Sequence, residues 1–202
     1  MILVFADLWM KIHEYTEFLL EFFKGFGYIG AFFMAFSEAF IAFLPLNLIV
    51  ITNVTNYGIG LGFLLSWLGA TIGSFLLFLL VRYFLSDWFM NTKYIKSSKL
   101  APKVFKWIDE KGLWFVLILM SIPVLAQFFI SIVCALSKFR KREYLFAIAV
   151  ARAVMIGSFA FLGESIHNIH DNPLQLVFSI LVIAGIALLG KVVQKKYFKE
   201  EV

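Results

Sequence analysis

Residues 39–81 read AFIAFLPLNLIVITNVTNYGIGLGFLLSWLGATIGSFLLFLLV and contain no Asp, Glu, Lys or Arg. A helix crosses the hydrocarbon core of a bilayer with about 20 residues, so this stretch is too long for one crossing. It also fits two plain crossings poorly, because Pro45, three asparagines and a glycine cluster interrupt it. Interrupted backbone at membrane depth is tolerated where protein or a water-filled cavity surrounds it, as in transporter binding sites. The stretch therefore predicts a protein that binds or moves something within a bilayer.

The composition extends this prediction to the whole chain. Of the 202 residues, 62% are hydrophobic and only 15% are charged, far from the averages of soluble domains. We expect a single all-α polytopic membrane domain over residues 1–202. Cys134 is the only cysteine, so an internal disulfide is excluded and a packing role is indicated. The net charge of +5 is not taken as a sign of nucleic-acid binding, because its distribution follows membrane topology.

Most of the Lys and Arg residues fall into three basic regions. Of 18 in all, seven lie in residues 82–111, four in 138–142 and four in 191–199. Residues 164–171 have none. Since cytoplasmic loops are enriched in Lys and Arg, the three basic regions and the C-terminus are predicted to be cytoplasmic, and residues 164–171 external.

The uncharged segment 113–137 lies between two of these basic regions. A simple crossing would put one of them outside, whereas a re-entrant hairpin that breaks near Pro123 keeps both inside. Residues 144–163 then cross outward, and residues 173–190 cross back as a C-terminal transmembrane helix.

The same reasoning applies to the first half of the chain. The crossing Ile59–Val81 ends inside at Arg82, so the preceding segment Gly27–Asn56 must begin and end outside. This makes it a second re-entrant hairpin, which breaks near Pro45 and is opposite in direction to the first. Each half is therefore predicted to be a hairpin followed by a transmembrane helix, and the two halves are inverted.

A short repeat supports a first repeat over residues 25–82 and a second over residues 112–163. The sequence IGSF at 72–75 recurs at 156–159, an offset of 84. Inverted repeats with broken helices are the architecture of many secondary transporters.

Two flanking segments are predicted to lie along the membrane surface. The cytoplasmic loop 83–111 contains a helix from Pro102 to Lys111, with apolar residues on one face and lysines on another. Such a helix is attracted to anionic lipid headgroups, and the alternative is a solvated basic linker. Residues 1–24 form an amphipathic N-terminal helix, for which a membrane crossing is the alternative.

Several short motifs occur in an order and spacing that suggest a known family. They are Glu38 with LPLN at 44–47, GATIGS at 69–74 followed by Arg82, SIP at 121–123, and LSKFRKREY at 136–144. Over residues 25–165 the chain resembles the DedA superfamily, also called the VTT or SNARE-associated Golgi protein family. The resemblance implies polytopic proteins with two opposed re-entrant hairpins. It also implies translocation or scrambling of lipids, including the undecaprenyl phosphate carrier of bacterial envelopes.

The chain departs from the family pattern at four positions. The family often has an acidic residue where Asn47 stands and an Asp where Ser74 stands, and it has arginines where this chain has Met120 and Ala126. The lost arginines put direct phosphate binding at the second hairpin in doubt, and the sequence there is closer to the VTT branch. The retained family residues are Glu38, Pro45, Arg82 and Pro123.

Glu38 and Arg152 are the first candidates for a working site. A carboxylate at membrane depth must be protonated, paired or facing water, and each state is useful in transport. The alternative for Glu38 is a place at the external interface. The Arg152 guanidinium, near the middle of a predicted crossing, needs a carboxylate or a phosphate, which it binds bidentately. The alternative for Arg152 is a buried structural pair.

Asn47, Gln127 and Arg82 complete the predicted set for substrate binding or proton coupling. The two amides follow the predicted hairpin breaks, where they can satisfy freed backbone groups or bind a polar headgroup. Arg82 has the alternative role of a cytoplasmic anchor. Pro45 and Pro123 are predicted to be the helix breakers of the two hairpins.

The expected function is transport of a phosphate-containing lipid between the leaflets of the cell membrane, with proton coupling open. The expected partners are anionic membrane lipids, with no cofactor and no nucleic acid, and self-assembly is left open. A non-transporting scaffold and an ion- or proton-coupled small-molecule transporter are the alternatives. An enzyme is not expected, because the chain has neither a P-loop nor a G-x-S-x-G sequence. The only imidazoles, at His13, His167 and His170, lie outside the predicted membrane segments.

Overall fold

The computed structural model describes residues 22–23, 25–41, 44–92, 101–121, 127–167 and 184–185. These residues form helices and turns without a strand, which confirms the expected all-α class. In chain order the elements are α2 (Gly27–Glu38), α3 (Leu46–Leu80), the π-helical turn η1 (Val81–Leu85), α4 (Ser86–Asn91), α6 (Ala101–Ser121), α7 (Gln127–Leu136) and α8 (Lys141–His167). The predicted N-terminal helix, the break at Pro123 and the predicted C-terminal helix lie almost wholly outside the described residues.

The first half begins with a helical hairpin. The chain reverses after α2 and enters α3 through Pro45, whose backbone is extended (φ −78°, ψ 105°). The two arms are joined by Asn53, whose side-chain amide donates to the carbonyl oxygen of Ala31 at 3.3 Å. Pro45 therefore lies at the reversal between α2 and α3, and a re-entrant path of this hairpin in a membrane stays a prediction.

A second reversal divides α3 at Gly58. This residue has φ 78° and ψ 164°, a conformation open essentially to glycine alone. A Cβ atom on Gly62 would lie 2.6 Å from the Cα of Val54, and Asn53 Nδ2 is 2.9 Å from Ser66 Oγ. The segments 46–57 and 59–80 therefore run antiparallel, with the reversal at Gly58.

The long helix of the first half continues beyond its predicted end at Val81. It runs through η1 into α4 and ends at Asn91. No glycine or proline interrupts residues 81–91, so the charge of Arg82 does not end the helix.

The second half repeats this order of elements. A break at Gly112 (φ 61°) divides α6 into residues 101–111 and 113–121. In the first of these segments Ile108 is buried, whereas the side chain of Lys106 is 72% exposed, in keeping with the predicted amphipathic helix. The second segment and α7 are joined by Gln127, whose amide donates to the carbonyl oxygen of Met120 at 2.9 Å.

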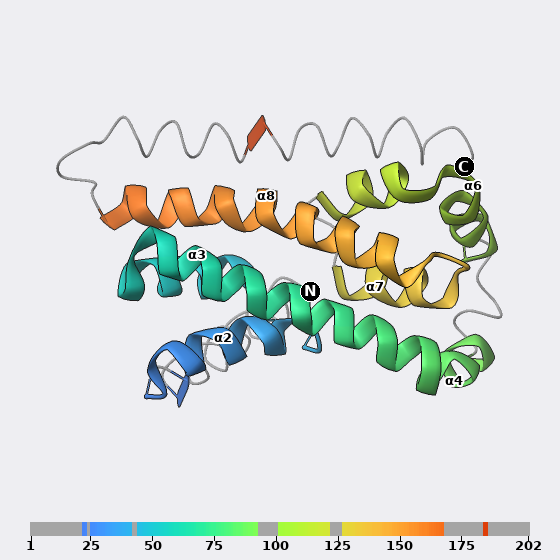
Figure 1. Ribbon diagram of the computed structural model, residues 1–202, viewed down its shortest axis with the longest axis horizontal. Coiled ribbons are helices and arrows are strands. Elements are labelled where there is room, and N and C mark those ends of the chain that lie inside the picture. Colours follow the sequence, from blue (N-terminus) through green and yellow to red (C-terminus); the bar gives the residue numbers. More distant parts are fainter. Residues whose placement is uncertain are drawn as a thin grey trace, which may run out of the picture.

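The long helices α3 and α8 lie side by side and form the centre of the molecule, with α2 packed on α3 (Figure 1). Trp67 donates to the carbonyl oxygen of Ala149 at 2.8 Å, and Phe78 stacks on Tyr144 at 4.0 Å between ring centroids. Later residues of α3 thus meet earlier residues of α8, so the two helices are antiparallel. Leu46–Asn91 and Lys141–Ser165 are apolar enough to cross a membrane, each with a mean hydropathy of 2.1.

Candidate functional site: a buried ion pair between the long helices

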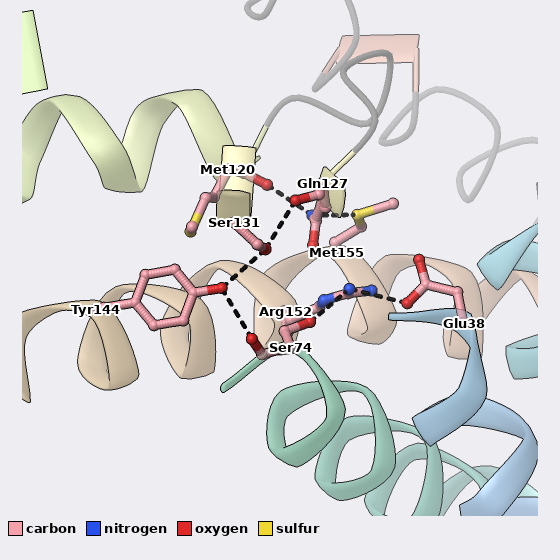
Figure 2. Close-up of polar contacts among 8 residues, drawn as sticks. All are labelled: Glu38, Ser74, Met120, Gln127, Ser131, Tyr144, Arg152 and Met155. Carbon is pink, nitrogen blue, oxygen red and sulfur yellow. Dashed lines mark hydrogen bonds and ion pairs between the residues drawn. The ribbon is translucent and has the colours of Figure 1, made fainter. Parts of the chain in front are cut away.

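Arg152 lies near the middle of α8 with only 1% of its surface exposed. Its Nη2 atom is 2.9 Å from Oε2 of Glu38, the last residue of α2. The same nitrogen donates to Oγ of Ser74 on α3 at 2.9 Å. Three elements that are distant in sequence therefore meet at one guanidinium (Figure 2).

The packing of α2 on α3 brings Glu38 to this position. A Cβ atom on Gly69 would lie 2.4 Å from the carbonyl oxygen of Phe32, and one on Gly73 would lie 2.5 Å from that of Phe36. The helices approach this closely because neither glycine has a side chain. This close packing brings the end of α2 to Ser74 and Arg152.

The guanidinium keeps hydrogen-bonding capacity beyond these two contacts. Among the described residues, Nε and Nη1 of Arg152 are buried and have no hydrogen-bond partner. The same is true of Oε1 of Gln127 and Oγ1 of Thr71. Buried polar groups are normally satisfied, so unpaired guanidinium donors are unusual. An anionic group with several oxygens is a suitable acceptor for them.

A second chain of polar contacts joins this pair to α7. The hydroxyl of Tyr144 lies 2.8 Å from Oγ of Ser131 and 3.3 Å from the carbonyl oxygen of Ser74. The Ser131 hydroxyl in turn donates to the carbonyl oxygen of Gln127 at 2.8 Å. Figure 2 shows these contacts as one connected series that ends at Glu38. The polar network therefore links α2 to α7 through α3 and α8.

Gln127 also touches the helix that carries Arg152. Its Nε2 is 3.3 Å from the sulfur of Met155, which lies three residues after Arg152 on the same face of α8. The structure thus brings together three of the five predicted site residues, Glu38, Gln127 and Arg152.

The other two predicted site residues lie elsewhere. Asn47 is exposed in the first turn of α3. Arg82 follows Ser74 by eight residues along a continuous helix, about 12 Å at the usual rise. Its guanidinium donates to carbonyl oxygens at the end of α7, among them that of Ala135 at 3.0 Å. A role in substrate binding stays a prediction for all five residues.

Sequence reasoning did not assign Ser74, Ser131 or Tyr144 to the site. In the sequence Ser74 stands out as part of the GATIGS motif and as a position where the family often has an Asp, but neither feature assigns it to a site. Ser131 lies one helical turn after Gln127, a spacing that places both on one face of α7. A helical projection of residues 127–136 would therefore have placed Ser131 beside Gln127. Tyr144 carries no such signal, because its hydroxyl meets Ser131 only in the folded structure, across 13 positions of sequence and from another helix.

The fold and this site define an integral membrane protein whose apolar helices bury an ion pair. Residues 44–165 match the family model described as the VTT domain. The chain belongs to this family, the DedA/VTT superfamily, and the resemblance inferred from its motifs is confirmed.

Two relatives come from Bacillus subtilis (strain 168). The "Uncharacterized membrane protein YhjE" is 31% identical over 182 residues, which cover 90% of this chain and 87% of the relative. The "Uncharacterized protein YqeD" is 24% identical over 152 residues, or 73% of this chain and 72% of the relative. No solved structure matches the chain.

Proposed function

We propose that the protein is a lipid transporter, a translocase or scramblase that moves a phosphate-containing lipid between leaflets. The observation that carries the proposal is the buried Arg152 guanidinium, held by Glu38 and Ser74 while Nε and Nη1 have no partner among the described residues. Arginine binds phosphate through several parallel hydrogen bonds, so the guanidinium is suited to an anionic headgroup.

Glu38 provides a means of controlling that binding. While it is ionised, its carboxylate neutralises Arg152 and competes with phosphate for the guanidinium. Protonation of Glu38 breaks this pairing and leaves a net positive charge for the headgroup. Release of the lipid on the other side restores the pair. This exchange makes proton coupling part of the proposal.

The lengths of the hairpin arms support the proposed membrane arrangement. The arms of the first hairpin, residues 27–38 and 46–57, contain 12 residues each, or about 18 Å of helix. This is well short of the roughly 30 Å hydrocarbon core, so each arm suits a re-entrant segment. The headgroup would pass between the two hairpins, and its acyl chains would stay in the bilayer.

The directions of the long helices support an inverted repeat. Equivalent helices of two inverted halves must run in opposite directions, as α3 and α8 do. The DedA/VTT family is also broadly linked to membrane transport. The proposal accordingly includes a multi-pass topology in the cell membrane, a cytoplasmic C-terminus and anionic lipids as partners.

Reconstitution into vesicles that contain a trace of headgroup-labelled anionic lipid tests the proposal. An impermeant quencher reaches only the label in the outer leaflet, which is about half of the total. Loss of more than half of the fluorescence therefore means that labelled lipid has moved from the inner leaflet. We expect wild-type protein to pass this limit and Arg152→Met to remain at it. Arg140→Met is the matched control, because that side chain is 83% exposed. Wild-type protein that leaves lipid sidedness unchanged would instead be a scaffold.

A further inference from the structure

Arg82 makes contacts that transport of a headgroup does not require. It lies in η1, and its guanidinium donates to four carbonyl oxygens at the C-terminal end of α7 and the loop after it. The acceptors are Cys134, Ala135, Ser137 and Phe139. The donor and its acceptors come from different halves of the chain.

The chemistry of a helix end explains why an arginine fits here. The last carbonyl groups of a helix have no partner within it, and together they carry a partial negative charge. A planar guanidinium can serve several of these oxygens at once, which an ammonium group cannot do with fixed geometry. Arg82 thus caps the C-terminal end of α7 from another helix, where the carbonyl oxygen of Cys134 also accepts from the Ser137 hydroxyl.

Aromatic rings hold the guanidinium in place and connect it to the polar network. Its Cζ lies 4.6 Å from the centre of the Phe78 ring, in a cation–π contact. Phe78 stacks in turn on Tyr144, whose hydroxyl contacts Ser131 on α7. The π-helical turn that carries Arg82 is a rare conformation, often found where a helix serves a special role. The helix α7 is therefore attached at its end to η1 by Arg82, and near its middle to α8 by Tyr144.

We propose that Arg82 is a positioning residue that clamps the C-terminal end of α7 to η1, the continuation of α3, so that Ser131 and Gln127 face the Arg152 network. Its effect on transport rests on the proposed function, whereas the clamp itself does not.

Cys134 reports on the clamp without any transport measurement. Its carbonyl oxygen accepts from Arg82, its side chain is 0% exposed, and it is the only cysteine of the chain. We expect N-ethylmaleimide to modify the native detergent-purified protein slowly and Arg82→Gln at least tenfold faster, as measured by mass spectrometry. Modification in Arg82→Lys should proceed at an intermediate rate, since lysine keeps the positive charge but loses the planar guanidinium that bonds several carbonyl oxygens at once. Arg140→Gln removes an exposed charge from the same end of the molecule and should match the wild type.

A second cysteine position distinguishes release of the clamp from general loosening of the fold. Ala160 is 1% exposed and packs in a separate core cluster with Leu46 and Val50. On a Cys134→Ser background, Ala160→Cys should be modified equally slowly with and without Arg82→Gln. Faster modification at both positions would overturn the proposal, because Arg82 would then stabilise the fold as a whole. Slow modification of Cys134 in Arg82→Gln would overturn it as well.

Transport measurements then separate positioning from direct substrate contact. A positioning role predicts that Arg82→Gln slows anionic and zwitterionic lipids by the same factor, at least fivefold. A loss confined to anionic lipids would mean that Arg82 touches the headgroup, and the positioning role would be wrong. If wild-type protein moves no lipid, the proposed function fails, while the Cys134 result still decides the clamp.

Discussion

At the residue scale, the central feature is a guanidinium that shares one nitrogen between a carboxylate and a hydroxyl. Glu38 and Ser74 both contact Nη2 of Arg152, at 2.9 Å each. Glu38 is 14% exposed and Arg152 is 1% exposed, so the two partners differ in their access to the surroundings. Arginine stays charged in proteins, so Glu38 is the member of the pair to which the proposal assigns proton exchange. Changes at the two residues should therefore have different consequences.

Replacing Arg152 should lower stability as well as transport. Breaking a buried ion pair by removing one partner costs about 3–5 kcal/mol, and the partial exposure of Glu38 places the cost of Arg152→Met near the lower end. Thermal unfolding in detergent measures it. Adding Glu38→Gln to Arg152→Met should recover much of the lost stability, because no charge is then stranded. Full stability in Arg152→Met alone would contradict the pairing.

Replacing Glu38 should remove pH dependence from transport. The amide in Glu38→Gln keeps the shape of the side chain but cannot exchange a proton. If protonation of Glu38 releases Arg152, transport by the variant should not vary with pH, and the protein should remain folded. Rates of lipid movement in vesicles across a pH series measure this, with wild-type protein in parallel. An unchanged pH profile in the variant would remove Glu38 from the coupling step.

The sequence allowed both members of the pair to be selected, but not the pairing. Glu38 and Arg152 stand out because charges in apolar segments are costly. Whether the arginine meets a carboxylate or a phosphate depends on where α2 ends relative to α8. That position follows from contacts of Gly69 and Gly73 with the backbone of α2, which only the folded structure shows.

At the scale of the elements, the reversals of the first half depend on Pro45 and Gly58. The proline and the glycine cluster are visible in the sequence, so both turns could be predicted. The continuation of the helix to Asn91 could not be predicted. A charged residue such as Arg82 marks where a membrane-spanning segment ends, but the helix can continue beyond that point. The clamp of Arg82 on α7 was equally hidden, since it joins residues from different halves of the chain.

Gly58→Ala should destabilise the first half of the molecule. The conformation at Gly58, φ 78° and ψ 164°, is essentially closed to residues with a side chain, at a cost of about 1–3 kcal/mol. Gly60→Ala is a close control, because nothing lies within 4 Å of its added methyl group and its φ is not positive. Thermal unfolding of the two variants should differ by the strain alone. Equal stability would mean that the chain does not reverse at Gly58.

At the scale of the whole molecule, the antiparallel helices α3 and α8 relate the two halves. Each half has two short helical segments followed by a long helix. The polar network passes from Glu38 in the first half to Gln127 in the second. A site shared in this way would be reached from both sides of a membrane only if the two hairpins enter from opposite sides.

Cysteine labelling tests that arrangement directly. On a Cys134→Ser background, Asn56→Cys lies in the exposed reversal at Gly58 and is predicted to face outside, whereas Arg140→Cys lies in the exposed loop before α8 and is predicted to face inside. In intact cells an impermeant maleimide should label position 56 and leave position 140 unlabelled until the membrane is permeabilised. Both residues are exposed in the protein, so burial cannot explain the difference. External labelling at position 140 would put the second hairpin on the same side as the first, and the inverted arrangement would be wrong.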